Sequence, residues 1–358
     1  MRCTPFLFIL FAMIWPDTPA QTPPPVPTVP SEPKTSIEWF QRAREQLNLR
    51  MPGSAPFQMK VTFHAFPGAE FLSGKEKPQI VTGDGIYEET WLSPNVWRRE
   101  ATLGEYHAIE EETDGVRKMQ ASSDYEPGRV LMLLDALLNP VPRNLASKEF
   151  RGEGASGWKI GHVTIGSTPL VSISKNIGSS KADYTDSFYF LPHGVLALRN
   201  EQGITIAWEG SVLFAGKVVS RHLTIKAIDR EMLTADIEVR AAGQVDPATF
   251  SLRGARAEPG MTLRPMQHFE LRFPCDISDS GSWVRPGRDS HPMLVSIRGV
   301  LDRHGRYREL ELIAMANSGD EASRDNVASW LAILRGAHHC GPEIDGSPTE
   351  VIWSWIFL

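Results

Sequence analysis

The twelve residues PGRVLMLLDALL, Pro127–Leu138, are the stretch that decides the fold of this chain. Proline is favoured at a helix start because its missing N–H would have no partner there. Apolar side chains then occupy nearly every position, so a helix here has almost no polar face. A helix that is apolar all round is buried, and twelve residues are too few to span a bilayer. The rest of the chain must therefore wrap this helix.

Strand patterns lie on both sides of the apolar helix. Alternating apolar and polar residues, which mark half-buried strands, recur over 57–66, 86–91, 96–103, 106–112, 116–121, 158–163, 171–174, 187–190, 195–200, 204–209, 217–228 and 231–240. Another helix is predicted over 36–49, where Pro52-Gly53 ends it. These patterns predict an α+β protein. Its core is a large curved antiparallel sheet, a half-barrel, with helices packed in its concavity.

Residues 36–255 resemble the LolA/LppX-like superfamily of periplasmic lipid carriers. Three pieces carry the resemblance: SIEWFQRAREQLNLR followed by FQMKVTFHAF, then GIYEETWLSPNVWRRE, and finally ADIEVRAAGQVDPATFSL. The resemblance implies an incomplete barrel lidded by helices. It also implies a hydrophobic cavity that accepts acyl chains or another apolar ligand.

Candidate ligand-binding residues follow from this resemblance. Trp91, Trp97 and Arg98 flank a Ser-Pro turn, at positions that line or rim the cavity in the superfamily. Leu131 and Leu134 represent the apolar helix. Ordinary core and surface packing also accounts for all five. The helix is either a permanent part of the core or a plug that a ligand displaces, and the sequence does not separate the two.

The C-terminal stretch from Met293 to Leu358 reads as two strands, a helix and a closing strand. Its pieces are GVLDRHGRYRELELI with a hairpin turn at 302–305, ANSGDEASRDNVASWL, and GPEIDGSPTEVIWSWIF. Glycine supplies the positive φ that such a tight turn needs. In this order the pieces resemble the C-terminal domain of TonB-family proteins. We therefore expect a small ββαβ domain over 290–358, after a connecting segment over 256–289.

The TonB-like resemblance implies docking of another protein. A small sheet with a free edge accepts an extended peptide as an added strand. The expected partner is a segment of an outer-membrane or periplasmic protein. Trp353 and Trp355 share one face of the last strand. They either contact that partner or pack against the helix of their own domain.

The N-terminus has the pattern of a secretory signal peptide. A positive start at Arg2, an apolar run over 6–15 and a small-residue site at Ala20 predict cleavage after residue 20. The alternative is an uncleaved membrane anchor. Residues 21–35 are a proline-rich linker, which favours extended chain. The expected location is the periplasm, and the cleaved protein is not expected to be integral to the membrane.

Composition limits the partners and the compartment. The chain has 358 residues, 41% of them hydrophobic and 22% charged, and a net charge of −6. Nucleic-acid binding calls for a basic surface, so it is not expected. Two cysteines follow the signal, Cys275 and Cys340. In an oxidising compartment they are either a disulfide or two buried thiols.

No sequence motif for catalysis is present. There is no His-Glu-x-x-His, Gly-x-Ser-x-Gly, P-loop or Gly-x-Gly-x-x-Gly, and we expect no catalytic residue, metal site or cofactor. The carboxylate runs Glu88-Glu89 and Glu110-Glu111-Glu112 are interpreted as solvated strand faces. The sequence thus predicts an exported, non-enzymatic envelope protein that binds a hydrophobic ligand or an envelope partner. The alternatives are a structural scaffold without ligand, and a hydrolase whose site is assembled only by the fold.

Overall fold

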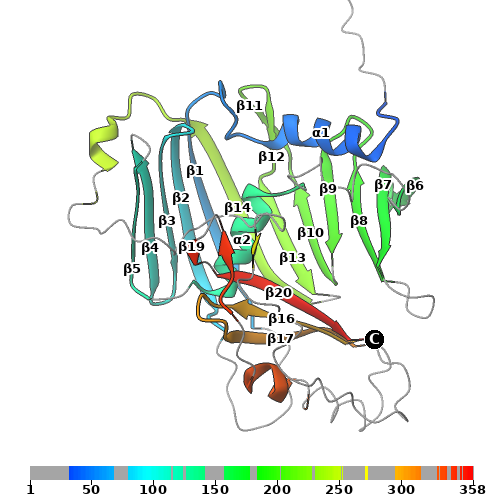
Figure 1. The fold of residues 1–358 in the computed structure, drawn as a ribbon. Coiled ribbons are helices and arrows are strands. Elements are labelled where there is room, and N and C mark those ends of the chain that lie inside the picture. The colour runs from blue at the N-terminus through cyan, green and yellow to red at the C-terminus, as the bar shows by residue number, and fades with distance from the viewer. Residues whose placement is uncertain are drawn as a thin grey trace, which may run out of the picture. The chain divides into compact units, whose positions relative to one another are not determined.

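Twelve strands form the main sheet. They are β1 (Phe57–Ala65), β2 (Gly83–Ser93), β3 (Val96–Leu103), β4 (Tyr106–Thr113), β5 (Val116–Ala121), β6 (Trp158–Ile165), β7 (Thr168–Ile177), β8 (Tyr184–Phe190), β9 (Leu196–Glu201), β10 (Ile204–Glu209), β13 (His222–Ala227) and β14 (Arg230–Ala241). Their order is β5-β4-β3-β2-β1-β14-β13-β10-β9-β8-β7-β6, and the sheet is open, curved and antiparallel (Figure 1). The predicted large, curved antiparallel sheet is confirmed.

The structure is a computed structural model. It describes residues 32–67, 80–113, 116–123, 126–141, 157–177, 184–201, 203–227, 230–250, 252, 271–272, 295–315, 329, 331–336, 340–344, 347–348 and 350–357. The signal peptide and most of the proline-rich linker that the sequence predicts lie outside these residues. Residues 32–358 form one compact unit.

Pairing of β1 with β14 makes one sheet from two distant halves of the chain. The register runs over nine residues, from Phe57 opposite Ala241 to Ala65 opposite Leu233. On its other side β1 pairs with β2. The strands that precede the apolar helix are therefore continuous with those that follow it.

Side-chain alternation gives the sheet an inner and an outer face. In β1, Phe57, Val61 and Phe63 are buried on the inner face, while Lys60 and Thr62 between them are exposed. Successive side chains of a strand point to opposite faces, so the cross-strand register carries this division from strand to strand. The inner face holds most of the apolar core.

Helix α1 (Ser36–Leu47) begins with a capping box. The Thr35 side chain accepts a hydrogen bond from the Glu38 N–H, and the Glu38 side chain accepts one from the Thr35 N–H. Such a box satisfies two N–H groups that the helix itself cannot bond. The helix buries Trp39 and Phe40, and Phe40 packs edge-on against Phe188 of β8 at 4.9 Å between ring centroids.

Helix α2 (Gly128–Leu138) is the predicted apolar helix, and it is buried as expected. Nine of its eleven residues are buried, and it packs against β14 of the main sheet. Its side chains share a core cluster with the inner face of β1, β2 and β3. Figure 1 shows α2 lying against the sheet beside β14.

Three strands near the C-terminus form what we call the C-terminal sheet. They are β16 (Val295–Leu301), β17 (Tyr307–Met315) and β20 (Val351–Phe357), in the order β17-β16-β20. The turn before β17 is closed by Asp302, whose Oδ1 accepts from the N–H groups of His304 and Arg306 at 2.9 Å. Residues 331–336 are helical, as the sequence predicts for this stretch, and they bury Leu331 and Leu334.

The single strand predicted over 217–228 is wrong. The chain instead forms β12 (Lys217–Val219), breaks at Ser220-Arg221, and resumes as β13. β12 pairs with β11 (Val212–Phe214) in a small hairpin of its own. The Arg221 N–H bonds to the Glu209 carbonyl instead, which ends the hairpin. The remaining elements are a 3₁₀ turn η1 (Pro247–Phe250), β15 (Leu271–Arg272), β18 (Glu343–Ile344) and β19 (Ser347–Pro348).

Candidate functional site

One apolar cluster between the inner face of the sheet and α2 contains three of the predicted ligand-binding residues, Trp91, Trp97 and Leu134. Trp91 and Trp97 lie directly opposite each other across β2 and β3, and both are buried. Trp91 also stacks on Phe57, with ring centroids 5.7 Å apart. On α2, Leu134 belongs to the same apolar cluster and Leu131 is also buried. The side chains of α2 and of the inner face are therefore packed together in the apolar core.

Arg98 does not belong to this site. Because neighbours along a strand alternate between faces, Arg98 points to the outer face while Trp97 points inward. Its guanidinium lies 3.4 Å from a carboxylate oxygen of Glu100 and 3.7 Å from one of Glu111. The structure therefore makes Arg98 part of an ionic cluster on the outer face of β3 and β4.

Buried charged side chains lie beside the apolar cluster on the inner face of the sheet. Glu89 of β2 is fully buried and accepts hydrogen bonds from Arg50, from Arg99 at 3.2 Å and from the Tyr87 hydroxyl at 3.0 Å. Burial opposes ionisation of Glu89. Arg50 and Arg99 outweigh that effect and lower the pKa of Glu89 to about 2. Glu89 is therefore an ionised anchor inside the protein.

Two arginines enclose the ring of Trp97. The Arg99 guanidinium carbon lies 4.3 Å from the ring centroid and that of Arg117 lies 5.1 Å from it. Arg117 also forms an ion pair with Glu110 of β4. A cation over an aromatic face is attracted by the ring's quadrupole. One wall of the site is thus an ordered row of charges and aromatic rings.

The interpretation of the carboxylate runs as solvated faces is wrong for Glu89, Glu110 and Glu111, which are buried. Glu88 is about half-exposed, as expected. The inner carboxylates are paired with arginines. On the outer face Glu111 accepts from the Leu252 N–H at 2.9 Å, because the segment that includes η1 covers it. Strand alternation predicts that Glu88 and Glu89 point to opposite faces of the sheet. It does not predict which arginines pair with the buried glutamates.

The N-terminus of α2 is capped by residues far away in the sequence. Pro127 makes no side-chain cap. Instead, a carboxylate oxygen of Glu350 accepts from the Glu126 N–H at 2.9 Å, and one of Glu309 accepts from the Gly128 N–H at 2.9 Å. The first N–H groups of a helix have no partner within the helix. Glu309 of the C-terminal sheet therefore supplies an acceptor for the first N–H group of α2, and Glu350 holds the residue before the N-cap.

Two buried carboxyls near this cap resist ionisation. Burial, together with Glu350 and Glu110, raises the pKa of Glu126. Burial also raises the pKa of Glu350, although Arg308 and the Glu126 N–H oppose the shift. Arg308 contacts Glu350 at 2.9 Å. Carboxyls in such surroundings retain protons to a higher pH than they would in water.

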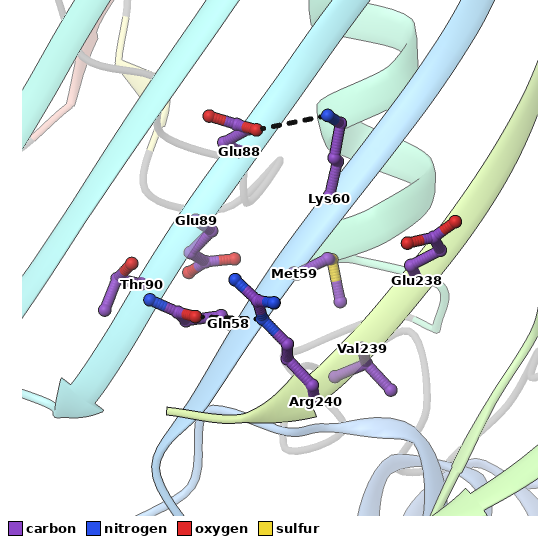
Figure 2. A pocket seen from close by; sticks show the side chains of 9 residues that line it. All are labelled: Gln58, Met59, Lys60, Glu88, Glu89, Thr90, Glu238, Val239 and Arg240. Atoms are coloured by element: carbon purple, nitrogen blue, oxygen red, sulfur yellow. Dashed lines mark hydrogen bonds and ion pairs between the residues drawn. The ribbon is translucent and has the colours of Figure 1, made fainter. Parts of the chain in front are cut away.

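A separate hollow of about 450 Å³ lies on the sheet at β1, β2 and β14 (Figure 2). Its wall includes two polar contacts, between Lys60 and Glu88 at 3.7 Å and between Arg240 and Gln58 at 3.0 Å. Lys60 and Glu88 are exposed on the outer face, away from the apolar core. Met59 and Val239 also line this hollow, so its wall combines apolar side chains with charges of both signs.

Other predicted site residues are described only in part. The strand backbone pairs Trp353 with Gly299 and Trp355 with Ile297, while their side chains lie outside what the structure describes. Cys340 is disulfide-bonded. Cys275 falls outside the described residues, so the pairing of Cys275 with Cys340 stays a prediction.

Neither a membrane-spanning helix nor a metal-binding cluster is present among the described residues. None of the helices there combines the length and apolar character needed to cross a bilayer. Within the same residues, no group of three or more histidine, cysteine, aspartate or glutamate side chains is placed to hold a metal ion.

Comparison with known proteins finds similarity among solved structures only. No protein-family model matches the sequence, and no curated protein matches it. A solved structure that resembles it is that of the LolA superfamily protein NE2245 from Nitrosomonas europaea, with a TM-score of 0.31 and 8% identity. The match covers 61% of this chain and 97% of that one. This similarity is too low to assign a family or a function. None of the comparisons supports a TonB C-terminal domain.

Proposed function

We propose that this chain is an exported, non-enzymatic binding protein whose curved sheet holds an apolar molecule, and that α2 fills the ligand's place when no ligand is bound. The observation that carries the proposal is α2 itself. This short helix is apolar except for Arg129 and Asp135, packs against the inner face of the sheet, and takes the acceptor for its first N–H group, that of Gly128, from the distant Glu309.

The energetics of α2 favour a displaceable element. An isolated helix of about eleven residues is marginal in water. α2 has no acidic residue in its first turn and no basic residue in its last turn, so it lacks the charges that stabilise helix ends. Its stability comes from burying side chains such as Leu133 and Leu134, each contributing about 1.5–3 kcal/mol. An apolar ligand that covers the same sheet surface would recover much of that energy.

The remaining parts of the proposal concern location and docking. Residues 1–20 would direct export to the periplasm. The C-terminal sheet would dock an extended segment of another envelope protein by strand addition. Among the described strands of that sheet, β17 and β20 are the outer ones, and each pairs with β16 alone. A proline in the accepting edge strand should abolish such binding, because proline donates no backbone hydrogen bond.

The full burial of α2 favours a second candidate, a structural scaffold without ligand. In that case α2 is a permanent part of the core. Weakening its packing would lower stability and create no binding site. The two candidates therefore differ in what a core substitution on α2 does to ligand affinity.

An apolar fluorescent probe separates them. The protein is stripped of lipid and titrated with 1-N-phenylnaphthylamine as wild type, Leu134→Ala and Leu196→Ala. Both leucines are almost fully buried, but Leu196 packs under α1 in a separate cluster. Each substitution is expected to cost about 2–5 kcal/mol of stability.

If the protein binds a ligand in place of α2, Leu134→Ala should bind the probe more tightly, because a weakened α2 competes less well for the sheet. Leu196→Ala should bind the probe as the wild type does. Absence of probe binding in every variant, or equal gains in both, would support the scaffold.

A further inference from the structure

Three glutamates from the C-terminal part of the chain converge on the first turn of α2. Glu309 and Glu311 belong to β17, and Glu350 precedes β20. Glu309 and Glu350 accept backbone N–H groups at the helix start, and Glu311 binds the side chain of Arg129. An anion is favoured at a helix N-terminus by both the free N–H groups and the helix dipole.

The Arg129–Glu311 pair is the strongest of these contacts. Arg129 Nη1 and Nη2 donate to the two carboxylate oxygens of Glu311 at 2.9 and 3.0 Å. The side chains are only 3% and 6% exposed. Arg129 Nε also donates to the Phe66 carbonyl at the end of β1, at 3.2 Å. One arginine therefore ties together the main sheet, α2 and the C-terminal sheet.

Gly128 makes the close approach possible. A Cβ atom at this position would lie 2.8 Å from a carboxylate oxygen of Glu309 and 3.3 Å from Val300. Glycine is a poor helix former, costing about 1 kcal/mol relative to alanine within a helix. Glycine at the start of α2 therefore permits the contact with Glu309, although it makes the helix itself less stable.

We infer that the C-terminal sheet is a latch that holds α2 in the concavity, and that releasing this latch exposes the apolar site. The second half of this inference rests on the proposed function. The first half stands on the contacts alone, because β17 of this sheet supplies both the Glu309 cap and the Glu311 ion pair, which α2 does not have locally. A partner that engages the C-terminal sheet would then control access to the ligand site.

The latch is also expected to respond to pH. Burial raises the pKa of Glu309 to about 7, although the Gly128 N–H, Arg308 and Arg129 oppose the shift and Glu311 adds to it. A carboxyl whose pKa is raised by burial stabilises the closed state most at low pH, and this contribution is lost as the pH rises through about 7. The latch should hold at pH 5 and loosen by pH 8.

The surroundings of Glu126 and Glu350 also predict that the latch loosens as the pH rises. Glu126 faces Glu350 and Glu110, and burial together with both of these raises its pKa. Glu350 faces Arg308 and Asp302; burial raises its pKa, Asp302 adds to the shift and Arg308 opposes it. Opening would expose these carboxyls to water and release their protons.

Hydrogen–deuterium exchange of the full chain, read at residues 128–138, tests the latch without any ligand. The variants are Glu311→Gln, which breaks the buried pair, and Glu88→Gln, which breaks the exposed pair with Lys60. In Glu311→Gln the protection factors of α2 should fall by at least about tenfold, as loss of one partner of a buried pair implies. Strands β10 and β13 should keep their protection, and Glu88→Gln should match the wild type.

Gly128→Ala is the second variant, for use if Glu311→Gln does not fold. It improves helix propensity but displaces Glu309, so the latch predicts lower protection of α2 and a purely local helix predicts higher protection. In the wild type, protection should be lower at pH 8 than at pH 5, and Glu309→Gln should reduce that difference. Unchanged protection of α2 in Glu311→Gln, or a gain in Gly128→Ala, would overturn the latch.

Probe binding in the same variants separates the latch from the proposed function. Faster exchange in α2 with stronger binding of 1-N-phenylnaphthylamine supports both. Faster exchange without probe binding keeps the latch, removes its link to ligand access and counts against the carrier.

Discussion

Arg129 of α2 and Glu311 of β17 form a two-point ion pair that is almost wholly buried, although 182 residues separate them in the chain. Breaking such a pair by removing one partner is expected to cost about 3–5 kcal/mol, because a buried charge is left without a partner. Replacing both partners by apolar residues is often neutral or stabilising. Glu311→Met should therefore be much less stable than the double variant Arg129→Met, Glu311→Met.

Urea unfolding of the wild type, the two single variants and the double variant measures this coupling. Arg129 also donates a hydrogen bond to the Phe66 carbonyl, so Arg129→Met removes this bond in addition to the ion pair. A double-variant loss equal to the sum of the two single-variant losses would show that the two side chains are not coupled.

Glu89 should make the fold sensitive to acid. Its pKa is lowered to about 2 in the folded protein, against an ordinary value of 4.5. The stabilising contribution is therefore present above pH 4.5 and lost as the pH falls through about 2, and it amounts to roughly 3 kcal/mol at about 1.4 kcal/mol per pKa unit. Glu89→Gln should be less stable than the wild type at pH 6.

The gap between Glu89→Gln and the wild type should narrow towards pH 2. Unfolding free energies measured at intervals from pH 6 to pH 2 give the comparison. A gap that stays constant over this range would mean that Glu89 is not ionised in the folded protein.

Gly85 is needed for the packing of Phe63 across β1 and β2. A Cβ atom at Gly85 would lie 2.2 Å from the Phe63 ring, so Gly85→Ala must displace the ring. Overpacking of this kind costs about 1–3 kcal/mol. Gly336→Ala is a suitable control, because its added Cβ meets nothing within 4 Å. Thermal unfolding should show a clear loss for Gly85→Ala and none for Gly336→Ala.

The disulfide at Cys340 gives a prediction about the mature chain. If Cys275 is its partner, alkylation without reductant should label no cysteine in the wild type. Cys275→Ser should then free one thiol, at Cys340. Intact mass after alkylation counts the labels, and a wild type that takes up label would contradict this pairing.

Local sequence patterns were sufficient for much of the fold. The apolar run that became α2 and the alternation in β3 and β10 predicted buried elements with bounds that the structure nearly reproduces. The break at Ser220-Arg221 was not predictable, because apolar residues continue on both sides of it. A strand's period says which face a residue occupies, and it does not say where the strand leaves the sheet.

The candidate site was predicted less completely. Trp91, Trp97 and Leu134 were chosen from the resemblance to the lipid carriers, and their burial in one apolar cluster is also what ordinary core packing predicts. Arg98 was grouped with Trp97 because the two are neighbours in the sequence, although neighbours along a strand point to opposite faces of the sheet. Glu89 was interpreted as solvated, and it is buried because Arg50 and Arg99 from other segments of the chain pair with it. Those contacts depend on the strand register and the loop positions, which the sequence pattern does not fix.

Native mass spectrometry of the mature protein, purified gently from the periplasm of a Gram-negative host, tests the central claim most directly. The account predicts an added mass that disappears after organic extraction, is identified as a lipid or another apolar molecule, and is retained more strongly by Glu311→Gln than by Glu88→Gln. A protein without added mass, unchanged after incubation with envelope lipids in all three forms, would contradict the claim that the concavity of the sheet is a ligand site.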